Sequence, residues 1–111
     1  SETRALLARN LDLLRAFMNR HAERFIWAPP AAGPVTFPRL REPERWGSAD
    51  AFCRKARDEA GVLLAPGALF GGLPAPAGVE AAVANSFRVG FGRASFPEAL
   101  DVFDGWLAAG P

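Results

Sequence analysis

The alternating stretch FRVGFGR at positions 87–93 restricts the possible folds more than any other part of the sequence. Successive side chains of a β-strand point to opposite faces, so Phe87, Val89 and Phe91 share one face. The other face carries Arg88 between serine and glycine residues. An apolar face must be buried against another layer of the protein, whereas the opposite face need not be. The stretch therefore predicts a one-sided sheet, with Arg88 on the uncovered face and little beside it on its own strand.

A long amphipathic helix is predicted at residues 2–24. Its apolar side chains recur at helical spacing, and they are Leu7, Leu11, Leu14, Met18 and Ala22. Such a helix is about 33 Å long at ~1.5 Å per residue, whereas a domain of ~100 residues has a radius of gyration of only ~13 Å. We expect it either to cross the whole domain or to pack in part on something absent here.

Two further helices carry end signals. Ser48 is predicted to cap a helix over residues 49–60, and Gly61 to end it. The apolar stripe of that helix contains Ala49, Phe52, Cys53, Ala56 and Ala60. The last helix is expected after Ser95, which stands in capping-box spacing with Glu98. Its predicted buried stripe contains Ala99, Leu100, Phe103, Trp106 and Leu107.

Short apolar runs predict strands at residues 25–27, 34–40 and 62–64, in addition to the Arg88 strand. Pro38 places the second run at a sheet edge or a bulge. The order is then helix, strand, strand, helix, strand, strand, helix. This order predicts an α+β fold, with a small sheet of three or four strands and helices packed on one face. At 111 residues the chain is expected to form a single domain.

Charge and composition exclude several classes of partner. The chain has 13 basic and 12 acidic residues, a formal net charge of +1, and no long run of either sign. We therefore expect neither nucleic acid nor a membrane as a partner. No apolar stretch approaches a membrane span, and no signal-peptide pattern is present, so we expect a soluble, cytoplasmic protein. One cysteine and one histidine cannot form an internal disulfide or a zinc ligand set, and no metal site is expected.

Three reactive side chains have structural interpretations. Cys53 lies on the buried stripe of its helix, which favours a core thiol. His21 is near the C-terminal end of the first helix, where contact with the helix dipole is favourable. Lys55 could form a Schiff base in principle, but it lies off the apolar stripe and is interpreted as solvated. Gly71 and Gly72 lack the strand, spacing and helix of a phosphate-binding loop.

Two features remain as candidates for a ligand site. The corner formed by Pro66 and Gly67 has no bulky side chain and lets the backbone approach a ligand, and Phe70 can wall a pocket. Arg88 has two interpretations from its strand alone. It is either a solvent-facing arginine on a half-exposed sheet, or a planar fork held ready for a carboxylate or phosphate.

Taken in order, several motifs resemble a known enzyme family. They are N-L-x-L-L in the first helix, then A-G-V-L-L-A-P-G-A-L-F-G, F-R-V-G-F-G, and P-E-A-L-D-V-F in the last helix. The series resembles the small C-terminal domain of class I/II aminotransferases, which are fold-type I enzymes that use pyridoxal phosphate (PLP). The resemblance runs from about Asn10 to Leu107. Its most specific parts are Pro66-Gly67 with Phe70-Gly71, and Phe87-Arg88-Val89 some twenty residues later.

The resemblance implies roles for individual residues. Arg88 would bind the α-carboxylate of an amino-acid substrate, while Pro66, Gly67 and Phe70 would lie near the active site without a catalytic role. Helix 2–24 would bridge to a large domain. The lysine that forms a Schiff base with PLP, the partner of the pyridine nitrogen and the phosphate ligands belong to that large domain, and no stretch here matches them. The chain is thus expected to be a fragment without catalytic residues, inactive alone and a poor binder of PLP.

The whole enzyme is expected to transfer an amino group between an α-amino acid and a 2-oxo acid in amino-acid metabolism. The resemblance implies a homodimer with active sites at the subunit interface. Another fold-type I reaction on the same carboxylate clamp stays open, as do two other classes of function. One is a free-standing regulatory module that binds a small carboxylate at Arg88. The other is a structural interaction domain in which Arg88 has no ligand.

Overall fold

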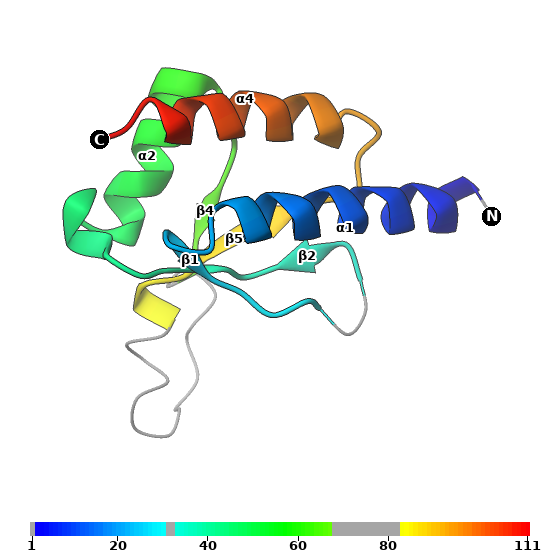
Figure 1. The fold of residues 1–111 in the computed structure, drawn as a ribbon, viewed down its shortest axis with the longest axis horizontal. Helices are drawn as coiled ribbons and strands as arrows, with labels where there is room; N and C mark the ends of the chain where they lie inside the picture. Colours follow the sequence, from blue (N-terminus) through cyan, green and yellow to red (C-terminus); the bar gives the residue numbers. More distant parts are fainter. Residues whose placement is uncertain (1, 31–32, 68–82) are drawn as a thin grey trace.

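The computed structural model describes residues 2–30, 33–67 and 83–111 (Figure 1). The helices are α1 (Glu2–Arg20), α2 (Ala49–Ala60), α4 (Phe96–Ala108) and the short 3-10 helix η1 (Pro43–Arg45). The strands are β1 (Phe25–Ile26), β2 (Val35–Thr36), β3 (Arg39–Leu40), β4 (Ala65–Pro66) and β5 (Phe87–Gly90). The predicted α+β fold class is confirmed.

The strands form two small antiparallel sheets. β5 is the central strand of a three-stranded sheet in the order β2-β5-β4, and β1 pairs with β3 in a two-stranded sheet. A bridge between Arg39 and Ser86 joins the two sheets. The predicted strand over 34–40 is therefore split into β2 and β3 around Pro38, whose ring cannot donate a ladder hydrogen bond.

The predicted alternation along β5 is present. Phe87, Val89 and Phe91 are buried, whereas Arg88 and Gly90 are exposed. The ring of Phe87 lies 5.4 Å from that of Phe25 in β1 and 5.1 Å from that of Phe52 in α2. The contact with Phe52 joins the sheet to the helical layer, in which α1 packs against α4 and α4 against α2 (Figure 1).

Helix α2 has the predicted ends. The Oγ of Ser48 accepts a hydrogen bond from the N–H of Ala51 at 3.0 Å, and Gly61 ends the helix with a φ of 69°. Helix α1 ends at Arg20, earlier than the predicted residue 24. The N–H groups of Arg24 and Phe25 both bond to the carbonyl of His21, and this turn leads the chain into β1.

Three local predictions were wrong. No strand covers 62–64, because the N–H of Val62 still bonds back to the carbonyl of Ala56 and completes the end of α2; pairing with β5 begins at Ala65. Ser95 occupies the N-cap position of α4, but its side chain makes no capping hydrogen bond, so the expected capping box does not form. Ala99, expected on the buried stripe, is exposed.

The N-terminal part of α1 lies at the margin of the core, against which Leu7 is only partly buried. The helix is about 28 Å long at ~1.5 Å per residue, and its first buried side chain is that of Asn10. In Figure 1 the N-terminal turns project past the end of β2. Within the described ranges, no helix combines the length and the apolar character that crossing a membrane requires.

Candidate functional site

Arg88 projects from the uncovered face of β5. It is paired with Ala65 of β4, and its neighbours Phe87 and Val89 are 0% and 5% exposed on the opposite face. A Cβ atom built on Gly90 would meet no atom within 4 Å, so the space beside Arg88 on its own face is open at that position. The pairing and the buried neighbours fix the backbone from which Arg88 projects.

A cleft of about 480 Å³ opens where β5 runs past the end of β4. Its lining is mainly apolar and comes from α1, α4, β5 and the segment before β4. Among the described residues that line it, the charged ones are Arg88 and Arg93. An apolar cavity with a few convergent polar groups is typical of a small-molecule site. Both are arginines, and a guanidinium group suits an anionic ligand.

Arg93 is a residue for which the sequence analysis predicted no role. It follows β5, and α1 holds this stretch of backbone. The side-chain Nδ2 of Asn10 donates to the carbonyls of Phe91 and Arg93, both at 2.9 Å. Asn10 is 0% exposed. A signal was present, since Asn10 is a polar residue in helical register with Leu7 and Leu14, but its partners could be named only from the structure.

The corner at Pro66 and Gly67 lies next to Arg88 through its pairing with β5. Pro66 is opposite Phe87, and the N–H of Gly67 donates to the carbonyl of Ser86 at 2.8 Å. A Cβ atom on Gly67 would lie 1.8 Å from the Oγ of Ser86. Glycine is therefore required here, because only a residue without a Cβ atom lets the backbone come this close to Ser86 at the start of β5. Phe70, the third residue of the predicted corner, lies outside the described residues.

The other reactive side chains are not at the cleft. Cys53 is buried, as predicted, and burial together with nearby Asp50 raises the pKa of its thiol to about 12. Lys55 is exposed on α2, and its Nζ donates to the carbonyl of Trp46 at 3.4 Å. In the part of the chain that the structure describes, no group of three or more His, Cys, Asp and Glu side chains could hold a metal ion.

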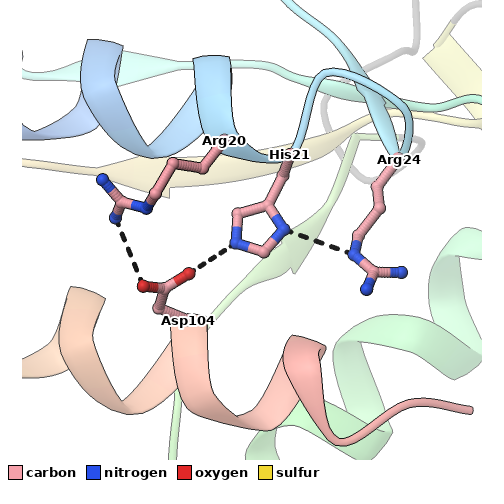
Figure 2. A network of polar contacts seen from close by, with 4 residues as sticks. All are labelled: Arg20, His21, Arg24 and Asp104. Carbon is pink, nitrogen blue, oxygen red and sulfur yellow. Dashed lines mark hydrogen bonds and ion pairs between the residues drawn. The ribbon is translucent and has the colours of Figure 1, made fainter.

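His21 takes part in a polar network between α1 and α4 (Figure 2). Its Nε2 lies 2.5 Å from Oδ1 of Asp104, and its Nδ1 accepts from Nε of Arg24 at 3.3 Å. Arg20 forms an ion pair with the same carboxylate at 3.3 Å. The hydrogen bond from His21 lowers the pKa of Asp104, and the charge of Arg20 adds to that effect. Both ring nitrogens are engaged, so His21 joins the two helices and is not available as a base.

Comparison with known proteins links this fold to PLP-dependent enzymes. No model of a protein family matches the chain, and no curated protein does. Among solved structures, the PLP-dependent cyclase OrfR shares 29% identity at a TM-score of 0.75, over 95% of this chain and 26% of that one. The aromatic aminotransferase from Pyrococcus horikoshii OT3 shares 21% identity at 0.75, over 97% and 26%. A PLP-dependent aminotransferase from Streptococcus suis 89-1591 shares 20% identity at 0.73, over 99% and 26%.

These matches cover nearly all of this chain but only part of each larger structure. The chain spans about a quarter of the length of the solved structures that it matches. Its fold is therefore that of one part of PLP-dependent aminotransferases and of a PLP-dependent cyclase. The likeness indicated by the sequence motifs is confirmed at the level of the fold.

Proposed function

We propose that this chain is the small, C-terminal domain of a larger PLP-dependent aminotransferase. The enzyme would transfer an amino group between an α-amino acid and a 2-oxo acid. The observation that carries the proposal is the position of Arg88, which is exposed and lines an apolar cleft. The fold supports it, because nearly the whole chain matches one part of such enzymes, about a quarter of their length.

In this proposal Arg88 binds the α-carboxylate of the substrate. A guanidinium group can donate two parallel hydrogen bonds to a carboxylate. Hydrogen bonds to charged groups contribute about 1.5 to 3 kcal/mol each. Since β5 is paired on both sides, the arginine projects from a backbone that does not have to be ordered when the substrate binds. The planar pair fixes the orientation of the substrate, which is much of what a protein contributes when a cofactor supplies the chemistry.

The residues of this chain do not by themselves fit PLP. The only lysine in the sequence, Lys55, is exposed on α2, bonds to the carbonyl of Trp46 and does not line the cleft. The covalent site, the partner of the pyridine nitrogen and the phosphate ligands are therefore proposed to lie outside these 111 residues. We expect the chain alone to bind PLP poorly and to catalyse no amino transfer.

The rest of the assembly is proposed on the same basis. The first turns of α1, residues 2–9, contain no buried side chain and would reach toward the large PLP-binding domain of the same polypeptide. Pro66, Gly67 and Phe70 would lie near the active site. The whole enzyme would be a cytoplasmic homodimer with active sites at the subunit interface.

The test uses the full-length protein that contains this chain. We expect it to carry about one PLP per subunit, detected by visible absorbance and by release of the cofactor on denaturation. We expect it to form a new amino acid when it is given an α-amino acid and a 2-oxo acid. A purified protein that neither contains PLP nor takes it up would contradict the proposal. If such a protein still bound small carboxylates through Arg88, it would be a regulatory module.

A second candidate is a different PLP reaction on the same carboxylate clamp. The observation that favours it is the 29% identity with the PLP-dependent cyclase OrfR. Analysis of the products separates the two candidates, because amino transfer converts the 2-oxo acid into an amino acid, whereas a cyclisation leaves it unchanged.

A further inference from the structure

The part of β5 that follows Arg88 is paired with a neighbouring strand on one side. On the β4 side, the described pairing ends at Arg88 itself. On the β2 side it continues to Gly90, and the N–H of Phe91 then donates to the carbonyl of Pro34 at 2.8 Å. The backbone directly after Arg88 therefore depends on β2 and on the contacts that α1 makes with it.

Pro34 cannot complete its pairing with Phe91, and Asn10 of α1 takes its place. In an antiparallel pair of this kind each residue donates its N–H to the carbonyl of the other, but proline has no N–H. The carbonyl of Phe91, a residue that is 1% exposed, therefore lacks its donor from the strand. The Nδ2 of Asn10 donates to this carbonyl at 2.9 Å, and also to the carbonyl of Arg93 at 2.9 Å.

The surroundings of Asn10 indicate that it is not there for the stability of the core alone. Asn10 is 0% exposed, and within the described ranges its Oδ1 has no hydrogen-bond partner. A buried acceptor without a donor costs free energy, and an apolar side chain of the same size would avoid that cost. The benefit of an asparagine at this position is therefore confined to its two bonds with the end of β5.

These two bonds also set the distance between α1 and β5. Gly92 lies between the two bonded carbonyls, and a Cβ atom there would be 2.9 Å from Cβ of Pro34 and 3.8 Å from Cδ2 of Leu7. Without the bonds, the carbonyl of Phe91 would have to reach another donor, so the end of β5 would move relative to α1. Arg88 is close to this end on the same strand, and its guanidinium group would move with it.

We propose that Asn10 is a positioning residue for the carboxylate clamp. By holding the end of β5 against α1, it keeps the guanidinium group of Arg88 in the geometry that binds the α-carboxylate of the substrate. A bidentate pair needs both donors aligned with both oxygens, and a misplacement of about 1 Å can cost roughly 100-fold in rate. The inference rests on the proposed function, because it requires that Arg88 bind the substrate.

The first experiment measures substrate affinity in the full-length enzyme. The probe is the standard α-amino acid that changes the PLP absorbance of the wild type most. We expect Asn10→Leu, which has a similar size and no donors, to raise the dissociation constant about tenfold with PLP content unchanged. Asp104→Asn is the control, because the contacts of Asp104 join α1 to α4 through His21 and Arg20, and it should bind the probe like wild type. A wild-type dissociation constant in folded Asn10→Leu would overturn the proposal.

A double-mutant cycle separates positioning from a general loss of stability. If Asn10 acts through Arg88, Asn10→Leu should have no further effect on the dissociation constant in a protein that already carries Arg88→Gln. Independent effects of the two substitutions would overturn the proposal. Asn10→Ser keeps one donor, and it replaces Asn10→Leu in the same measurements if the latter does not fold.

A rescue experiment tests the hydrogen bond itself. Pro34→Ala should restore part of the affinity lost in Asn10→Leu, because residue 34 then has an N–H to donate to the carbonyl of Phe91. Pro38→Ala is the matched control, since Pro38 accepts from the N–H of Phe87 in the same way at 3.0 Å, and it should not restore affinity. No rescue by Pro34→Ala, or equal rescue by both, would overturn the proposal.

The same measurements keep this inference apart from the proposed function. If no standard amino acid changes the PLP absorbance, or if Arg88→Gln binds the probe like wild type, the proposed role of Arg88 is refuted and this inference with it. If Arg88→Gln weakens binding but Asn10→Leu does not, only the positioning role of Asn10 is refuted.

Discussion

Gly67 is the residue on which the corner beside Arg88 most depends. A methyl group there would overlap the side chain of Ser86 and approach the carbonyl of Val83 to 2.9 Å. We predict that Gly67→Ala lowers the free energy of unfolding by about 1 to 3 kcal/mol, the usual cost of overpacking. Gly90→Ala is the control, because its added methyl group meets no atom within 4 Å. Denaturant titration measures both, and equal losses would contradict the packing described.

The network around Asp104 makes a pH-dependent contribution to stability. The pKa of this carboxyl is lowered from its ordinary value of 3.8 in the folded protein, first by the hydrogen bond from His21. A lowered folded-state pKa means that the stabilisation is complete above the unfolded value and is lost as pH falls through the folded one. We predict that Asp104→Asn costs on the order of 1 kcal/mol at neutral pH.

The test is to follow this cost with pH. The difference in unfolding free energy between wild type and Asp104→Asn should stay constant from pH 7 to about pH 4 and shrink below that. Asp12→Asn, at an exposed position on α1, serves as the control. Its difference in unfolding free energy from wild type should be smaller than that of Asp104→Asn. A cost that grows below pH 4 would mean that the ionised carboxylate does not stabilise the fold.

Single residues differ in how far the sequence could predict them. The direction of Arg88 follows from strand alternation, which is a local rule, and the burial of Cys53 follows from helical periodicity. The importance of Arg93 depends on Asn10, which is 83 residues away in sequence and holds the carbonyl of Arg93. His21 was expected to contact the helix dipole, but its bond to Asp104 is equally distant in sequence. Such pairings appear only when the chain is folded.

At the scale of elements, the two serine N-caps of α2 and α4 should behave differently. The Oγ of Ser48 accepts from the N–H of Ala51, whereas Ser95 makes no capping hydrogen bond with its side chain. We predict that Ser48→Ala costs about 1 kcal/mol of unfolding free energy and that Ser95→Ala costs less than half as much. Thermal or denaturant unfolding of the two variants checks this, and equal losses would contradict the assigned caps.

Helix α2 was predictable to the residue because its signals are local. Ser48 and Gly61 mark its ends, and its apolar spacing gives the buried face. The strand predicted at 62–64 was misplaced because a short apolar run does not say where pairing begins. That point is set by the hydrogen bond from Val62 back to Ala56 and by the register of Ala65 with Arg88.

At the scale of the whole molecule, the alternation on β5 and the order of elements were enough to predict an α+β fold with its helices on one face. The cleft was not predictable, because its walls come from α1, α4, β5 and the segment before β4. Its shape depends on where β4 ends. The sequence did predict that Arg88 would be exposed while Phe87 and Val89 are buried on the opposite face, and this exposed arginine is the part of the site on which the proposed function depends.

The most direct test of the proposed function is the affinity of the full-length enzyme for its amino-acid substrate when Arg88 is replaced. With PLP absorbance as the signal, we predict that Arg88→Gln raises the dissociation constant about 30-fold or more, corresponding to about 2 kcal/mol. PLP content should stay unchanged, and Arg54→Gln should bind substrate like wild type. If Arg88→Gln binds substrate with the wild-type dissociation constant, Arg88 is not the carboxylate clamp and the account is contradicted.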